Sequence, residues 1–236
     1  MGFYDNYNFD GLKFFSQIKD KPGSSISEPY IDFLTVIKYL KARRQSISVA
    51  EIGIGYGATA LQILKLLDAD DVYYAFDFEK RLNDFADDLR ARDFGITCEV
   101  VLAANSDKLW DSYNWNLSDL VLQMRERNEA GIFDAVYLVG AHAFMHDGLA
   151  VCLLKELVKD GGILVLDDVF FAFDSCEWGR TVGLERFTKK QMSDCQILRV
   201  RKLFLDNDPN FEAITQPDAY RGIFKKRSVT PKFDGR

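Results

Sequence analysis

Three side chains that can move protons or hold cations follow two apolar segments of this sequence. His142 comes shortly after the apolar run 133–139, and Asp167 and Asp168 directly follow the run 163–166. Histidine is the side chain best suited to proton transfer near neutral pH. Adjacent carboxylates repel each other unless a cation, a substrate donor or a retained proton offsets the repulsion. We expect His142 to act as a general base, and Asp167 and Asp168 to orient an acceptor group or a divalent ion. A structural histidine and a solvated acidic turn are the alternatives.

A glycine-rich turn follows another apolar run, 47–52. An acidic residue and three glycines alternate with other residues there, as Glu51, Gly53, Gly55 and Gly57. Glycine allows tight turns and lets a ligand approach the backbone where a Cβ atom would clash. The helical pattern that follows directs its N-terminal N–H groups toward the same place. The turn therefore predicts a site for a cofactor that carries a nucleoside; a glycine-rich turn without a ligand is the alternative.

A second acidic residue supports this prediction. Asp77 ends the apolar run 72–77, twenty residues after Gly57. A carboxylate at that distance along the chain can accept hydrogen bonds from both ribose hydroxyls of a bound nucleoside. Dinucleotide-binding turns usually read G-x-G-x-x-G, where the third glycine allows the helix to pack while the turn holds a pyrophosphate. The different glycine spacing found here favours a nucleoside cofactor without a pyrophosphate.

Five apolar runs of strand length alternate with helical patterns, and two more strands are expected near the C-terminus. The seven predicted strands cover 47–52, 72–77, 97–102, 133–139, 163–166, 211–214 and 220–224. The predicted helices cover 58–67, 80–92, 107–129 with a break near 114–116, 147–159 and 187–203, after a first helix that begins near 27. This order predicts an α/β fold with a Rossmann-like, doubly wound, mostly parallel seven-stranded sheet and one antiparallel edge strand. Ligands bind beyond the carboxyl ends of the strands in such sheets.

The sequence shows no domain boundary, so we expect one domain over residues 1–236. It divides into an N-terminal cap and helix over 1–45, a cofactor-binding core over 46–170, and a substrate cap with C-terminal strands over 171–236.

Composition limits the classes of partner. The net charge of −6 disfavours nucleic-acid binding, and no apolar run is long enough to span a bilayer. The four cysteines form no C-x-x-C pair, which fits a reducing compartment. The N-terminus lacks the basic and apolar regions of a signal peptide. We expect a cytoplasmic protein with a small-molecule substrate; the sequence leaves a homo-oligomer open.

The run from Glu51 to Gly57 resembles motif I of the class I S-adenosylmethionine-dependent methyltransferases. The segment 158–168, with its Gly-Gly pair before the strand and the Asp pair after it, is similar to the macrocin- and catechol-type small-molecule O-methyltransferases. The resemblance covers about residues 27–170. It implies that S-adenosylmethionine is the cofactor and that a hydroxyl of a small molecule is methylated.

The resemblance also implies roles for individual residues. Glu51 and the glycines would line the cofactor, and Thr59 would bond its methionine carboxylate. The turn with Asn105 and Ser106 would meet the adenine, with Asn105 as the residue that reads the exocyclic amine. A helix N-cap formed by Asn105 or Ser106 is equally compatible with this sequence.

The sequence departs from this family after the fourth strand. The family typically has Asp-Gly-Asp-His there, with the first Asp as a magnesium ligand, whereas this chain has Val139, Gly140, Ala141 and His142. Asp167 and Asp168 match the remaining ligands, and two carboxylates hold Mg²⁺ more weakly than three. Two mechanisms remain open: a weakly held Mg²⁺, and a metal-free reaction that uses His142.

Two other functions compete with the methyltransferase. The missing acids keep open a non-catalytic S-adenosylmethionine-binding or interaction protein. An NAD-dependent oxidoreductase is disfavoured by the glycine spacing and because no Tyr-x-x-x-Lys pair lies near the predicted site.

Overall fold

Seven strands form one mixed sheet in the order β3-β2-β1-β4-β5-β7-β6. The structure is a computed structural model that describes residues 30–92 and 94–228. The strands are β1 (Ser48–Ile52), β2 (Val72–Phe78), β3 (Glu99–Asn105), β4 (Phe133–Leu138), β5 (Val158–Leu166), β6 (Phe211–Ala213) and β7 (Gly222–Lys226). The first five are parallel to one another. The predicted fold class is confirmed. The predicted N-terminal cap, which precedes the first helix, lies outside the described residues.

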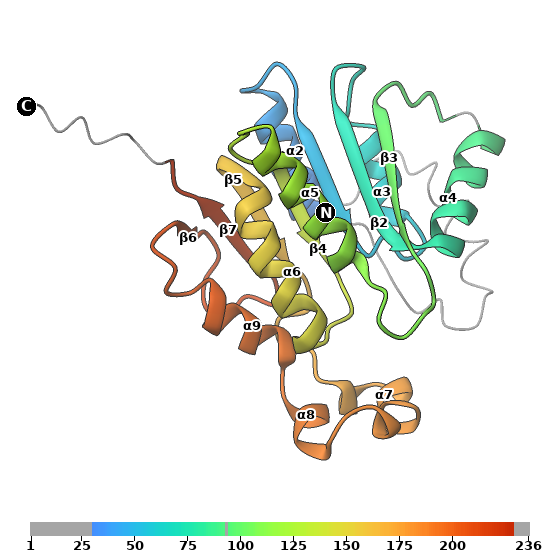
Figure 1. Cartoon of the computed structure of the whole chain (residues 1–236), viewed down its shortest axis with the longest axis vertical. Coiled ribbons are helices and arrows are strands. Elements are labelled where there is room, and N and C mark those ends of the chain that lie inside the picture. Colours follow the sequence, from blue (N-terminus) through green and yellow to red (C-terminus); the bar gives the residue numbers. More distant parts are fainter. Residues whose placement is uncertain (1–29, 93, 229–236) are drawn as a thin grey trace, which may run out of the picture.

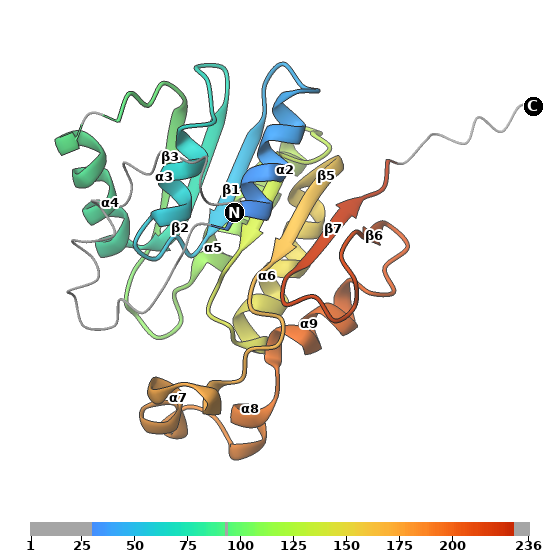
Figure 2. The same cartoon turned by 180° about the vertical axis from the view of Figure 1, so that it is seen from behind.

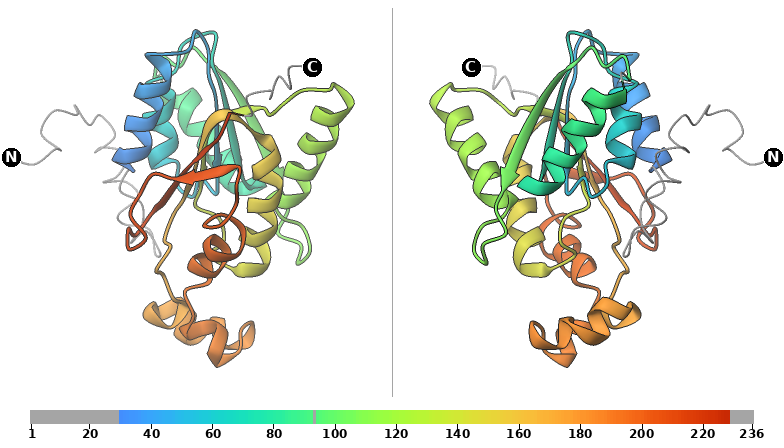
Figure 3. Two further views of the ribbon diagram at one scale, coloured as in Figure 1. Left: turned by 90° about the vertical axis from the view of Figure 1, so that its left-hand side faces the viewer. Right: turned by 90° about the vertical axis from the view of Figure 1, so that its right-hand side faces the viewer.

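Helices cover both faces of the sheet (Figures 1 and 3). One face carries α2 (Ile31–Lys41), α3 (Ala58–Leu64) and α4 (Glu79–Arg92), and the other carries α5 (Tyr113–Glu126), α6 (Phe144–Leu157) and α9 (Gln196–Phe204). Alternate residues of β1 enter the two layers, because successive side chains of a strand point to opposite faces. Val49 packs with α2 and α3, and Ala50 packs in the layer of α5 and α6. All five residues of β1 are buried, as expected for a central parallel strand.

Several predicted boundaries differ from those of the structure. The third strand extends to Asn105, because its pairing with β2 continues to the Phe78–Asn105 pair. α5 begins at Tyr113, where a break was expected, because the Ser112 side chain caps the helix. α6 ends at Leu157 and β5 starts at once. The helix predicted over 187–203 is two helices, α8 (Lys189–Ser193) and α9.

The antiparallel strand β7 brings the C-terminal part of the chain to the site. It inserts between β5 and the short edge strand β6, and its direction is opposite to that of β5 (Figure 2). Gly222, the first residue of β7, pairs with Leu166, the last residue of β5. The residues just before Gly222 therefore lie at the carboxyl end of β5.

A small cap lies beyond the carboxyl ends of the parallel strands (Figures 1 and 2). It consists of two 3-10 turns, η2 (Phe173–Ser175) and η3 (Gly183–Glu185), and two short helices, α7 (Glu177–Thr181) and α8. Phe173 and Met192 of the cap are buried together with Ala143, next to His142. The cap is thereby attached to the loop that follows β4.

Among the described residues, no helix combines the length and the hydropathy that crossing a bilayer requires.

Candidate active site

In the glycine-rich turn after β1, the space beside Gly55 is open, whereas the space beside Gly57 is occupied. Gly55 and Gly57 both have positive φ, 56° and 77°, a conformation that side chains with a Cβ rarely adopt. A Cβ atom on Gly57 would lie 2.5 Å from the ring of Phe85, so packing with α4 requires this glycine. A Cβ atom on Gly55 would meet nothing within 4 Å. The turn is therefore open at Gly55, where a ligand can approach the backbone.

Asp77 lies directly against this open turn. Its Oδ2 accepts a hydrogen bond from the Gly55 N–H at 2.8 Å, and its Oδ1 accepts one from the Phe78 N–H at 2.7 Å. Burial, the main cause, raises the pKa of Asp77 above its usual value, while these hydrogen bonds oppose the shift. Each carboxylate oxygen has two lone pairs, so Asp77 keeps acceptor sites for a pair of ribose hydroxyls.

Glu51 lies beneath the turn in β1. It is buried, and its Oε2 accepts a hydrogen bond from the Tyr73 hydroxyl at 2.7 Å. Burial raises the pKa of Glu51 to about 8. Thr59, which the resemblance assigned to the cofactor, is buried in the first turn of α3.

Asn105 ends β3 with an acceptor that has no partner. The residue is 5% exposed, and its Oδ1 makes no hydrogen bond with any described residue. Its Nδ2 donates to the Ser106 carbonyl at 3.3 Å. The N–H and the hydroxyl of Ser106 both donate to Asp111, each at 2.7 Å. Of the two predicted adenine contacts, Asn105 thus offers a free buried acceptor, whereas Ser106 is engaged in the turn.

The loop after β4 is held in shape by Asp147, a residue that sequence reasoning missed. Asp147 is buried in the first turn of α6 and accepts hydrogen bonds from the Ala143 N–H at 3.0 Å and the Ala141 N–H at 3.2 Å. The Tyr113 hydroxyl donates to the same carboxylate. Burial raises the pKa of Asp147, while the nearby His142 opposes the shift. This network presents His142 at the end of β4.

His142 and Asp168 face each other across the ends of β4 and β5. The His142 Nε2 lies 3.4 Å from the Asp168 Oδ2. Burial raises the pKa of Asp168, with a further contribution from the negative charge of Asp167. The His142 Nδ1 is buried and has no hydrogen-bond partner among the described residues. No described residue therefore engages this nitrogen.

Asp167 points to different partners from those of Asp168. Its Oδ2 accepts from the Tyr137 hydroxyl at 2.6 Å, and its Oδ1 accepts from the Arg221 Nε at 2.6 Å and from the Asp168 N–H at 2.9 Å. Tyr220, next to Arg221, lies close enough to the side chain of Asp168 to oppose the rise in the pKa of that carboxyl. Sequence reasoning missed Tyr137, Tyr220 and Arg221. The prediction of a strand over 220–224 was the available signal, because an antiparallel partner of β5 begins at the site.

The residues at this position do not fit a divalent metal ion. Among the described residues, no group of three or more His, Cys, Asp or Glu side chains is arranged to hold a metal. Asp167 already binds three donors, one of which is the permanently charged guanidinium of Arg221. Asp168 turns away toward His142. The carboxylates of Asp167 and Asp168 therefore do not point to one shared position. A cation, the Arg221 guanidinium, already lies against Asp167.

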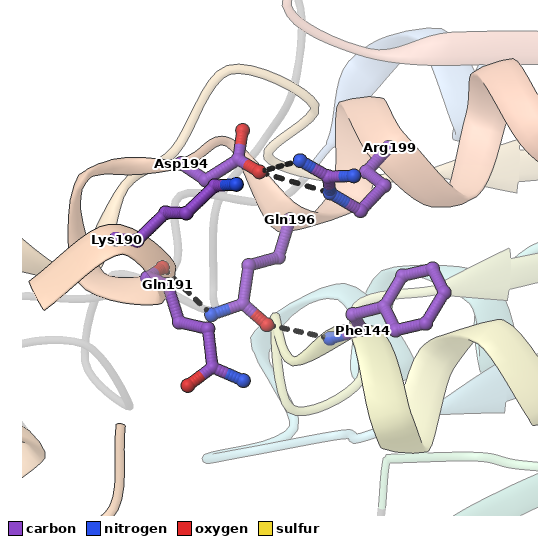
Figure 4. A pocket seen from close by; sticks show the side chains of 6 residues that line it. All are labelled: Phe144, Lys190, Gln191, Asp194, Gln196 and Arg199. Carbon is purple, nitrogen blue, oxygen red and sulfur yellow. Dashed lines mark hydrogen bonds and ion pairs between the residues drawn. The ribbon is translucent and has the colours of Figure 1, made fainter. Parts of the chain in front are cut away.

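A polar hollow of about 180 Å³ lies beside this site, between the start of α6 and the helices α8 and α9 (Figure 4). Gln196 crosses it: its Oε1 accepts from the Phe144 N–H at 2.8 Å, and its Nε2 donates to the Gln191 carbonyl at 3.0 Å. These bonds attach α8 of the cap to the first residue of α6, two residues after His142.

Comparison with known proteins places the fold among methyltransferases. No protein-family model and no curated protein sequence matches the chain. The O-methyltransferase TomG from Streptomyces achromogenes, solved in complex with S-adenosylmethionine, is 14% identical; the match covers 94% of this chain and 92% of TomG, with a TM-score of 0.58. The S-adenosylhomocysteine-bound methyltransferase PaMTH1 from Podospora anserina is 16% identical, with 92% and 86% covered and a TM-score of 0.56.

The fold is also shared with an enzyme that methylates carbon. The CurJ carbon methyltransferase is 16% identical, and the match covers 84% of this chain and 54% of the CurJ chain, with a TM-score of 0.55. The fold thus does not by itself select the acceptor atom. The chain has the Rossmann-like fold that these solved methyltransferases share.

Proposed function

We propose that this protein is an S-adenosylmethionine-dependent methyltransferase that acts on a hydroxyl group of a small molecule. One observation carries the proposal: a nucleoside cradle and a proton-accepting pair adjoin at one edge of the sheet. Gly55, Asp77 and Asn105 form the cradle, and His142 with Asp168 forms the pair. The cradle and the pair adjoin because the turn after β1 lies against the loop after β4. A Cβ atom added to Gly53 would lie only 3.1 Å from the Gly140 N.

The cradle fits the adenosine part of S-adenosylmethionine. Asp77 keeps acceptor sites for the ribose, and the unpartnered Oδ1 of Asn105 fits the exocyclic amine of adenine, which supplies the hydrogen-bond donor that this buried oxygen lacks. When bound, S-adenosylmethionine supplies an electrophilic methyl group on a positively charged sulfur. The tasks left to the chain are to align an acceptor oxygen with that methyl group and to remove its proton.

His142 is the proton acceptor in this proposal. Its unpartnered Nδ1 takes the proton of the acceptor hydroxyl, and the Asp168 carboxylate near Nε2 stabilises the imidazolium that forms. Aromatic side chains lie beside this pair: the ring centroids of His142 and Phe171 lie 5.2 Å apart, and those of Phe171 and Phe173 lie 5.3 Å apart.

Two measurements test this function. S-adenosylmethionine and S-adenosylhomocysteine should raise the melting temperature, because ligands that bind only the native state stabilise it, and NAD should not. Labelled S-adenosylmethionine should then transfer its methyl group to a member of a panel of phenols and alcohols, and NMR of the product should show an O–CH₃ group. A larger thermal shift with NAD would contradict the cofactor assignment. A thermal shift without transfer to any acceptor would favour the non-catalytic binder, and a C–CH₃ product would exclude oxygen as the acceptor atom.

A further inference from the structure

A positively charged side chain lies beside Asp167, in the part of the site where the methyl acceptor would bind. Arg221 is the residue before β7, and the pairing of Gly222 with Leu166 sets its backbone beside Asp167. Its Nε donates to the Asp167 Oδ1 at 2.6 Å. The two residues thus adjoin the last paired position of β5 and β7, and the hydrogen-bond ladder of the sheet brings their backbones together.

Aromatic side chains hold the guanidinium from the other side. The Arg221 Cζ lies 4.1 Å from the ring centroid of Tyr30, and the Tyr30 ring lies 5.3 Å from that of Tyr137. Tyr137 in turn donates to the second oxygen of Asp167. A guanidinium stacked on an aromatic ring and bonded to a carboxylate is strongly oriented.

The Arg221 guanidinium has further N–H donors besides the Nε that bonds to Asp167. Arg carries five N–H donors, and 34% of the Arg221 side chain remains exposed. It lies beside the acidic pair that would orient the acceptor, since it bonds to Asp167 and its neighbour Tyr220 lies close to Asp168. A fixed cation with free donors at this place is suited to an oxygen that develops negative charge.

We propose that Arg221 is the resident cation of the acceptor site, held on Asp167 in place of a divalent metal ion, and that it stabilises the acceptor oxygen during methyl transfer. This inference rests on the proposed function. In the reaction, the acceptor oxygen forms a bond to the methyl carbon. The S–CH₃ bond breaks, and its electron pair goes to sulfur. The hydroxyl proton goes to the His142 Nδ1, while the guanidinium offsets negative charge on the oxygen.

The first test uses Mn²⁺ as a paramagnetic probe and needs no acceptor. The electron paramagnetic resonance spectrum of free Mn²⁺ should be unchanged by the wild-type protein, with or without S-adenosylhomocysteine. A bound Mn²⁺ signal that disappears in Asp167→Asn would overturn the proposal. This outcome is independent of the proposed function, which fails if S-adenosylhomocysteine produces no thermal shift.

The second test measures turnover as release of S-adenosylhomocysteine with the acceptor found in the panel. Arg221→Gln should lower kcat by about 10²–10³-fold, the usual effect of losing one preorganised donor to an oxyanion. The thermal shift with S-adenosylhomocysteine should be unchanged, and Arg221→Lys should recover part of the rate. Lys225→Gln is the matched control: it removes an exposed cation from β7, the strand that follows Arg221, and should change neither quantity.

Arg221→Gln leaves Asp167 buried without its cation, and the unpaired charge can destabilise the fold. The paired variant Asp167→Asn with Arg221→Gln removes both charges, so it should regain thermal stability without regaining kcat. Wild-type kcat in the paired variant would overturn the proposal. Loss of wild-type turnover with a chelator, restored by Mg²⁺, would overturn it as well.

Discussion

The His142 Nε2 lies 3.4 Å from the Asp168 Oδ2, and both residues have positive φ, 53° and 50°. A residue other than glycine in this conformation costs about 1–3 kcal/mol and persists only where its surroundings fix it. Asp147 fixes the first of the two turns through backbone hydrogen bonds, and the Oδ1 of Asp167 fixes the second by accepting from the Asp168 N–H. Two strained residues at adjacent strand ends, turned toward each other, are typical of a functional site.

Replacing His142 should slow the reaction without weakening cofactor binding. We expect His142→Ala to lower kcat by roughly 10²–10⁴-fold, as the loss of a general base does, while the thermal shift with S-adenosylhomocysteine stays the same. His146→Ala is the control, since His146 lies in the first turn of α6 and is not part of the pair. Unchanged turnover in His142→Ala, together with full loss of turnover under a chelator, would show that the reaction depends on a metal.

Replacing Asp77 should remove cofactor binding. Asp77→Ala loses the proposed ribose acceptor, and we expect it to abolish the rise in melting temperature produced by S-adenosylhomocysteine. It also loses the bond to the Gly55 N–H, so its melting temperature without ligand is measured first. Asp84→Ala, on the exposed face of α4, is the control and should keep the full shift. An undiminished shift in Asp77→Ala would mean that the nucleoside binds elsewhere.

Adding a methyl group at Gly140 should displace Asp147. Gly140 has a φ of 66°, and its Cβ would overlap the Asp147 carboxylate. Gly95 has a φ of 65°, yet its Cβ would meet nothing within 4 Å. Gly95→Ala should therefore cost only the positive φ, about 1–2 kcal/mol, whereas Gly140→Ala should cost more and should also lower kcat, because the loop that presents His142 moves. Urea unfolding of both variants measures the difference; equal losses would contradict the role given to Asp147.

Replacing Glu51 should flatten the dependence of stability on pH. Burial raises the pKa of Glu51 from 4.5 to about 8. Between these values the unfolded chain has released the proton and the folded chain retains it, so the free energy of unfolding falls with rising pH, by up to about 1.4 kcal/mol per pH unit from this group. Below 4.5 both states are protonated, and above about 8 both are ionised, so this contribution is constant there.

Glu51→Gln keeps an acceptor for the Tyr73 hydroxyl and removes the titration. The unfolding free energy of this variant should therefore fall less steeply across that range than that of the wild type. Asp77, Asp147 and Asp168 also have raised pKa values and contribute with the same sign. They are present in both proteins, so the difference reports Glu51 together with its charge interaction with Asp77. Parallel pH profiles in urea unfolding would show that Glu51 does not titrate in this range.

The sequence alone determined the parallel core and the strand ends that meet at the site. Short apolar runs separated by helical patterns require a parallel sheet with helices on both faces, because neither face of such strands tolerates water. The carboxyl ends of parallel strands share one edge, so Asp77, Asn105, His142 and Asp167 could be assigned to one site before any contact was known. The sequence predicted the ends of strands and helices less well. The end of β3 was missed because two alanines with little strand preference of their own continue the strand through their pairing with β2.

Only the tertiary structure decided which partners these side chains have. Arg221 meets Asp167 across 54 positions of the sequence, and Asp147 and Tyr113 join across 34. Such contacts depend on the order and direction of strands and on the packing of helices, which local periodicity does not encode. The sequence placed two carboxylates after β5 but left open what balances their charge. The structure supplies a guanidinium for Asp167 and directs Asp168 to His142, because an antiparallel strand beside β5 begins where the parallel strands end.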